Sequence, residues 1–103
     1  MVSTAKHQRM QYEESERFHN YYERLVVEEA LRSDGEARRD EGYLSDVACV
    51  ALNHLPPRYV RYDVDMSFFL SPQEYMEMED KIREAVNHAI AHVRRNRNRD
   101  KDR

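Results

Sequence analysis

Cysteine, glycine, proline and tryptophan are all scarce in this 103-residue chain, which has one Cys, two Gly, three Pro and no Trp. The single Cys49 excludes an internal disulfide bond, and its apolar neighbours at residues 47–52 predict a buried small side chain, with a reactive thiol as the alternative. No run of about 18 apolar residues and no secretory leader is present. We therefore expect a cytoplasmic protein that does not span the membrane.

The charges are unevenly distributed along the chain. The whole chain carries a formal net charge of −3, but residues 94–103 hold six basic and two acidic residues, so the preceding body is distinctly acidic. An acidic body does not favour nucleic acid as a partner. We interpret residues 94–103 as a basic disordered tail, a solvated helix end, with nonspecific phosphate contact as the alternative.

No catalytic machinery is recognisable in the sequence. It shows no activated Ser or Cys, no glycine-rich phosphate loop and no carboxylate dyad, so we expect no enzymatic activity. His88 and His92 stand four residues apart, but no third ligand is close in the sequence. We therefore predict no metal site and no cofactor.

The hydrophobic pattern predicts one mainly α-helical domain of three main helices, over residues 11–93, after a flexible arm at residues 1–10. The first helix is expected at residues 12–32, and Ser33-Asp34-Gly35 ends it before a charged loop that reaches Gly42. Ser45 is the predicted N-cap of a short buried helix, which must end at Pro56 and Pro57.

The last helix has the clearest signals. Ser71, Pro72 and Glu74 stand where a capping box with proline at the first helical position requires them. Its core face is predicted from the spacing of three and four between apolar residues: Tyr75, Met78, Ile82, Ala85, Val86, Ala89 and Val93. The limited supply of large aliphatic residues predicts a domain that a partner subunit completes.

Residues 58–65 form the candidate ligand-binding segment, because arginine, tyrosine and aspartate are concentrated there and the segment favours an extended chain. In a strand, Tyr59, Arg61 and Asp63 share one face and supply a stacking ring, a bidentate donor and an acceptor, the groups that recognise guanine. Arg58, on the other face, can reach a phosphate. The alternative is structural: Tyr59 and Val60 pack on the core while Arg61 and Asp63 form a solvated pair.

Two motifs resemble the late competence development protein ComFB family, in its branch without the cysteine cluster. They are Phe-His-Asn-Tyr-Tyr-Glu-x-Leu-Val at residues 18–26 and Ala-Leu-Asn-x-Leu-Pro-Pro-x-Tyr-Val at residues 51–60. The resemblance implies a small helical homodimer. The zinc-binding cysteines of some members are missing between residues 34 and 45, so no zinc site carries over. Within the second motif, Asn53 is expected to tether the turn at the prolines.

Family members have been linked to cyclic di-GMP, so the resemblance implies a receptor for a cyclic dinucleotide, with Arg58, Tyr59, Arg61 and Asp63 as candidate ligand-binding residues. A two-fold symmetric ligand suits a two-fold symmetric dimer. The competing hypothesis is a scaffold or interaction module that binds a protein partner and no small molecule.

Overall fold

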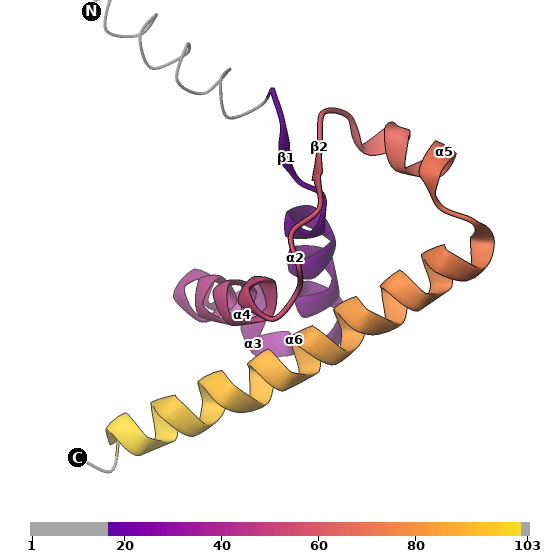
Figure 1. The fold of residues 1–103 in the computed structure, drawn as a ribbon. Helices are drawn as coiled ribbons and strands as arrows, with labels where there is room; N and C mark the ends of the chain where they lie inside the picture. Colours follow the sequence, from indigo (N-terminus) through magenta and orange to yellow (C-terminus); the bar gives the residue numbers. More distant parts are fainter. Residues whose placement is uncertain (1–16, 102–103) are drawn as a thin grey trace, which may run out of the picture.

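Three helices pack around one core in the computed structural model, which describes residues 17–101 (Figure 1). They are α2 (Tyr22–Ser33), α4 (Glu41–Asn53) and the long α6 (Pro72–Lys101). This arrangement confirms the prediction of a mainly helical domain with three main helices. The arm expected at residues 1–10 and the beginning of the predicted first helix lie outside the described residues. No helix in the described part is long and apolar enough to cross a membrane.

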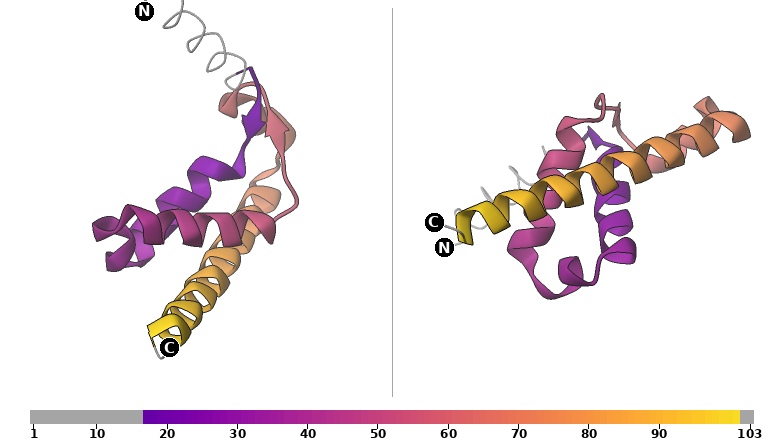
Figure 2. Two further views of the ribbon diagram at one scale, coloured as in Figure 1. Left: turned by 90° about the vertical axis from the view of Figure 1, so that its left-hand side faces the viewer. Right: turned by 90° about the horizontal axis from the view of Figure 1, so that it is seen from below.

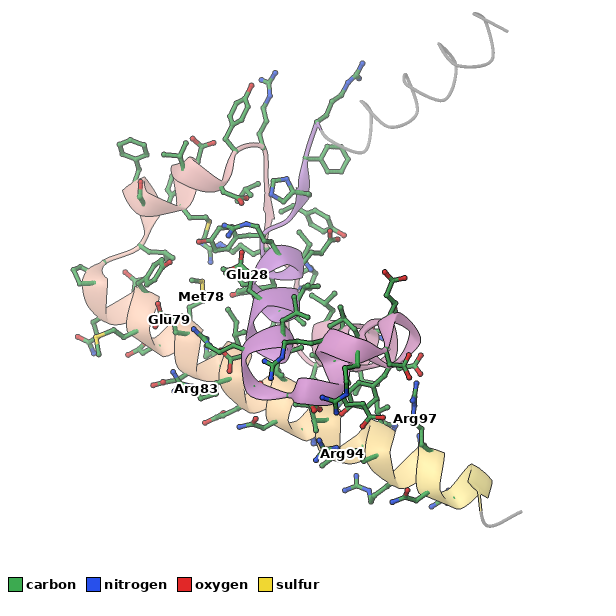
Figure 3. The ribbon with its side chains drawn as sticks, turned by 180° about the vertical axis from the view of Figure 1, so that it is seen from behind. Glu28, Met78, Glu79, Arg83, Arg94 and Arg97 are labelled. Carbon is green, nitrogen blue, oxygen red and sulfur yellow. The ribbon has the colours of Figure 1, made fainter. Side chains whose placement is uncertain are left out.

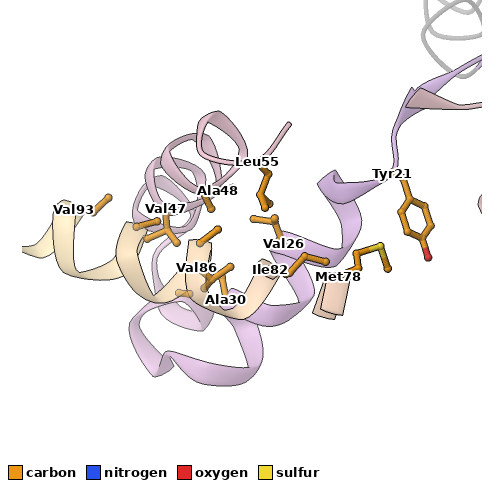
Figure 4. Packing of buried hydrophobic residues seen from close by; sticks show 14 of the residues in the cluster. Tyr21, Val26, Ala30, Val47, Ala48, Leu55, Met78, Ile82, Val86 and Val93 are labelled. Carbon is orange, nitrogen blue, oxygen red and sulfur yellow. The ribbon is translucent and has the colours of Figure 1, made fainter. Parts of the chain in front are cut away.

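The core forms where α6 crosses α2 and α4 (Figure 4). One stripe of α6, with apolar residues three or four apart, meets the buried faces of the other two helices. Its predicted members from Met78 to Val93 are all buried, whereas Tyr75 remains 39% exposed. The buried apolar residues of the three helices are Val26, Ala30, Tyr43, Val47, Ala48, Ala51, Met78, Ile82, Ala85, Val86, Ala89 and Val93. The several alanines among them allow the helix axes to approach closely.

The first helix begins later than the sequence predicts. Residues His19–Asn20 form the short strand β1, and α2 starts only at Tyr22. The Asn20 Oδ1 atom accepts a hydrogen bond from the Tyr22 backbone N–H at 3.2 Å, which satisfies one donor of the first helical turn. The prediction of continuous helix through residues 17–21 is therefore wrong, because pairing with a distant strand replaces helix there.

The predicted charged loop is largely helical. Helix α3 (Gly35–Arg39) lies inside it, and α4 begins at Glu41 rather than after Ser45. Two aspartates act as N-caps: Asp34 Oδ1 accepts from the Glu36 N–H, and Asp40 Oδ1 accepts from the Tyr43 N–H, both at 3.0 Å. The Tyr43 side chain is completely buried and holds this segment on the domain.

Two short strands from distant parts of the chain form an antiparallel sheet above the helical body (Figure 1). We call residues 18–21 and 58–62 the hairpin for short, although α2, α3 and α4 and not a tight turn lie between the two strands. Strand β2 (Tyr59–Val60) pairs with β1 so that His19 faces Val60 and Asn20 faces Tyr59. Beyond Val60 the predicted extended segment turns into a 3-10 helix, η1 (Asp63–Asp65), and the one-turn helix α5 (Met66–Phe69). The prediction of an extended chain through Asp65 therefore holds only for its beginning.

The beginning of α6 projects beyond α2 and α4 in two perpendicular views (Figures 1 and 2). The capping box is confirmed, because Ser71 Oγ accepts from the Glu74 N–H and Glu74 Oε1 accepts from the Ser71 N–H, each at 3.2 Å. The radius of gyration of 16.6 Å exceeds the value of about 13 Å typical of a domain of about 100 residues. We call residues 63–76 the overhanging segment, and it leaves surface that the described part of the chain does not cover.

The opposite end of α6 contains the residues predicted to form a solvated helix end that becomes disordered. The helix continues to Lys101, and Arg94 and Arg97 lie beside α3 and α4 (Figure 3). Arg94 Nη2 lies 3.1 Å from Asp34 Oδ1, and Arg97 Nη1 lies 3.1 Å from Asp40 Oδ2. These basic residues therefore belong to the folded domain, where they balance the aspartates that cap α3 and α4.

Cys49 is exposed on α4, which corrects the prediction of a buried side chain. Val47, Ala48 and Ala51 occupy the buried side of the helix, and Cys49 lies outside that side, in a surface depression that α4 shares with α6. A run of apolar residues in a helix does not bury all of its members when only one side meets the core.

Candidate ligand-binding hairpin

The hairpin holds the backbone of Arg58 from two directions. Asn20, which is 9% exposed, accepts a hydrogen bond from the Arg58 N–H at 3.0 Å through Oδ1. The Tyr21 N–H donates to the Arg58 carbonyl oxygen at 2.6 Å. Asn20 thus performs the tethering role that the sequence analysis assigned to Asn53, which instead ends α4 with an exposed side chain. These two hydrogen bonds fix the backbone of Arg58, the residue that follows the two prolines.

Tyr59 presents its ring to solvent together with Phe18. The two residues are 65% and 60% exposed, and their ring centroids lie 6.1 Å apart with an interplanar angle of 73°. This edge-to-face pair links the strand β2 to the residue before β1. An exposed aromatic face of this kind is suited to stacking on a flat ligand.

Arg58 lies on the other side of β2, where it lines a shallow depression of about 140 Å³. The depression is shared with α2, α5 and the first turns of α6, through Tyr22, Met66, Leu70, Glu74, Glu77, Met78 and Lys81. The predicted separation of Arg58 from Tyr59 is consistent with the strand geometry. Arg58 and Lys81 are the cationic groups of this depression, and two glutamates accompany them.

Arg61 stacks on the neighbouring Tyr62, with its guanidinium carbon 5.2 Å from the ring centroid. Both side chains are exposed, and no carboxylate within the described residues lies within ion-pair distance of Arg61. The donors of this guanidinium therefore remain accessible to a ligand from solvent.

Asp63 is engaged by residues of its own chain. Its Oδ1 atom lies 2.5 Å from His19 Nε2, and its Oδ2 atom accepts from Arg24 Nε at 3.2 Å and from Arg24 Nη2 at 3.1 Å. The hydrogen bond with His19 and the Arg24 guanidinium lower the pKa of Asp63, although burial opposes them. Asp63 thus connects η1 to β1 and α2, and it does not share a strand face with Tyr59 because the strand ends at Val60.

The structure combines parts of both predictions for residues 58–65. Val60 packs against the core, as the structural alternative expects, but Tyr59 does not. Asp63 is paired, although with His19 and Arg24 rather than with Arg61. The structure leaves Arg58, Tyr59 and Arg61 exposed, and their role in binding stays a prediction.

The exposed large apolar residues of the described region are confined to the hairpin and the overhanging segment. They are Phe18, Tyr59, Tyr62, Val64, Phe68, Phe69, Tyr75 and Met76. Their side chains are between 39% and 80% exposed, so this part of the chain presents several large apolar groups to solvent. Sequence reasoning missed this surface, although Phe68 and Phe69 precede the capping box and lie outside any predicted helix face.

The comparison with known families agrees with this fold. The family described as late competence development protein ComFB matches residues 19–97. This chain belongs to the ComFB family. The match includes strands β1 and β2, helices α2 and α4, and α6 as far as Arg97, and with it the two arginines that cover Asp34 and Asp40. No curated protein and no solved structure matches the chain.

Proposed function

We propose that this ComFB-family protein is a non-enzymatic, cytoplasmic receptor for a cyclic dinucleotide, cyclic di-GMP above all, that acts as a homodimer on a protein partner. The observation that supports this proposal best is the exposed group of Tyr59, Phe18 and Arg61 on the hairpin. The aromatic rings supply a stacking surface for a guanine base, and the guanidinium supplies paired donors for its O6 and N7 atoms.

The hairpin also reduces the electrostatic repulsion that a doubly negative ligand would meet on a protein with a net negative charge. Asp63, which follows Arg61 by two positions, is paired with Arg24 and His19. Arg58 and Arg61 are left to balance the phosphates, since a guanidinium binds phosphate in a bidentate manner. With Asp63 engaged inside the chain, we assign it the role of holding η1 in place for Arg61 and not that of a base acceptor.

We expect Arg61→Ala to weaken cyclic di-GMP binding roughly 10- to 100-fold, because it removes one bidentate contact. The measurement is calorimetric titration at two salt concentrations, with cyclic di-AMP and GMP as comparison ligands. Arg39→Ala is the matched control, since Arg39 is an exposed arginine on α3, and it should leave the affinity unchanged. Unchanged affinity in Arg61→Ala would show that the site lies elsewhere, and absence of heat in the native protein would reject the receptor.

A second candidate function, a protein-interaction module, is favoured by the apolar surface on the overhanging segment. Large apolar side chains that a chain leaves exposed are typical of surfaces that another protein covers, and Phe68 and Phe69 are 80% and 69% exposed here. Helix α5 has its main contacts with η1 and not with the three-helix body. In this view the same surface joins two copies of the chain or one copy to another protein.

We expect the double substitution Phe68→Ser and Phe69→Ser to separate a dimer into monomers, because these residues are 80% and 69% exposed and do not stabilise the monomer core. Sedimentation velocity over a range of concentrations measures this change, and circular dichroism checks that the helices persist. The control is Cys49→Ser, a substitution to the same residue at another exposed position, on α4. A dimer that survives the double substitution places its interface on another surface.

A further inference from the structure

A groove of about 370 Å³ lies between α2 and the first turns of α6. Its apolar part consists of Leu25, Tyr75, Met78 and Ile82, and charged side chains stand along its rim. Figure 3 shows the two sides of the groove, with Glu28 on α2 and with Met78 and Glu79 on α6. Within the described residues the lining comes from these two helices alone, so the aromatic residues of α5 do not fill the groove of their own chain.

The charges at the rim of this groove are largely paired within the chain. Three ion pairs, each formed along one helix, hold them: Arg24 with Glu28 and Arg32 with Glu29 on α2, and Arg83 with Asp80 on α6. An apolar side chain can therefore enter between the rims without leaving a buried charge that has no partner. The groove is suited to an uncharged occupant.

The overhanging segment supplies an uncharged apolar projection of matching size. Residues 66–73 contain no charged side chain, in a chain of which 36% of the residues are charged. Phe68 and Phe69 stand in this run on α5, and both are exposed. A cavity of about 150 Å³ holds one benzene ring, so the groove has room for two aromatic rings. An aromatic centre inside a polar rim is a common composition of protein interfaces.

We propose that α5 of one copy of the chain inserts Phe68 and Phe69 into the groove between α2 and α6 of a second copy, which inserts its own α5 in return. This inference rests on the homodimer of the proposed function and names the two surfaces that form it. The projection and the groove belong to different parts of the same chain. A reciprocal exchange uses each of them once and closes the assembly around a two-fold axis.

Leu25→Asn tests the groove side of this contact. Leu25 is a partly buried residue of α2 that lines the groove, and a polar amide there opposes the entry of an aromatic ring. We expect the dissociation constant of the dimer, measured by sedimentation velocity over a range of concentrations, to rise at least tenfold. Leu44→Asn is the matched control, because Leu44 is also partly buried against the core but lies on α4, away from the groove. Circular dichroism checks that both variants keep their helices, and equal dissociation constants in the two would contradict the proposal.

Crosslinking between copies tests the contact with exposed residues that do not support the core. Cys49 is the only cysteine of the chain, so Cys49→Ser gives a cysteine-free background. In this background one chain carries Ser67→Cys on α5, and another carries Glu79→Cys at the rim of the groove. Both positions are exposed. The two chains are unfolded together in urea, refolded as a mixture and treated with a short bismaleimide, and we expect a covalent dimer on a denaturing gel.

The matched control combines Ser67→Cys with Arg39→Cys, an exposed position on α3 outside the groove, and should give at least tenfold less covalent dimer. If the native protein sediments as a dimer and Glu79→Cys crosslinks no better than Arg39→Cys, the exchange is overturned and the homodimer stands. A native protein that stays monomeric at all concentrations would reject the homodimer and the exchange together. Assemblies larger than a dimer would overturn the two-fold arrangement.

Discussion

Replacement of Asp34 by alanine is expected to lower the free energy of unfolding by about 3 kcal/mol, because one buried carboxylate serves several partners. Asp34 is 5% exposed and accepts hydrogen bonds from the Tyr43 hydroxyl, from the Glu36 N–H and from Arg94. Alanine removes the N-cap of α3, worth about 1 kcal/mol, and leaves the buried Tyr43 hydroxyl without its acceptor, which costs about 1–3 kcal/mol. Urea denaturation followed by circular dichroism, at fixed protein concentration, measures the loss.

Asp46→Ala is the matched control for this substitution. Asp46 also faces an arginine of α6, at 3.6 Å from Arg97, but its side chain is 63% exposed. An exposed pair contributes less than about 1 kcal/mol. The urea midpoint of this variant should therefore be close to that of the native protein. Equal stability of the Asp34 and Asp46 variants would mean that the buried cluster does not stabilise the fold.

The stabilising effect of Asp34 should also depend on pH. Burial raises the pKa of Asp34, but the hydrogen bonds from Tyr43 and Glu36 and the charge of Arg94 outweigh it, so the pKa lies below its usual value. A lowered pKa in the folded state means that stability is present above the unfolded value of about 3.9 and is lost as pH falls through the folded pKa. The stability difference between the native protein and Asp34→Ala should therefore narrow below about pH 4.

Removal of residues 94–103 is expected to lower the free energy of unfolding by about 2–3 kcal/mol, whereas a disordered tail would be removed without loss. The truncation takes Arg94 away from the buried Asp34 and takes Arg97 away from Asp40 and from the Tyr43 ring, whose centroid lies 4.9 Å from the guanidinium carbon. A hydrogen bond to a charged group contributes about 1.5–3 kcal/mol, and a cation–π contact adds about 0.5–1 kcal/mol.

A chain that ends at Asn98 supplies the control for the truncation, because it keeps Arg94 and Arg97 and loses only the last five residues. Its urea midpoint should match that of the native protein. If the two truncated chains unfold at the same midpoint, the contacts of Arg94 and Arg97 contribute nothing and the interpretation of residues 94–101 as part of the folded domain is wrong.

Much of the helical architecture could be predicted because its signals are local. The capping box at Ser71 and Glu74, the stop at Pro56 and Pro57, and the apolar spacing of α6 each depend on residues within one or two turns of each other. The same local reasoning predicted the wrong start for α4, because Ser45 and Asp40 are both residue types that commonly form N-caps. Asp40 becomes the N-cap because Tyr43, in the first turn of α4, is completely buried against the rest of the domain.

The candidate site was predictable in its residue types but not in its geometry. Arginine and tyrosine at positions 58–61 are evident in the printed sequence, and their exposure agrees with a binding surface. The partners of Asp63 could not be predicted, because His19 and Arg24 lie 44 and 39 positions earlier in the chain. Pairing of β1 with β2 places them together and ends the strand before Asp63.

The sequence by itself determined which segments become the three main helices, that α4 ends before the two prolines, and that α6 begins at Pro72. It also determined the membership in the ComFB family. Only the tertiary structure decided that Asn20 holds the turn and that Arg94 and Arg97 belong to the body. Capping and hydrophobic spacing act between residues a few positions apart, whereas these contacts join residues 38 to 60 positions apart, which only the packing of α6 and the hairpin brings together.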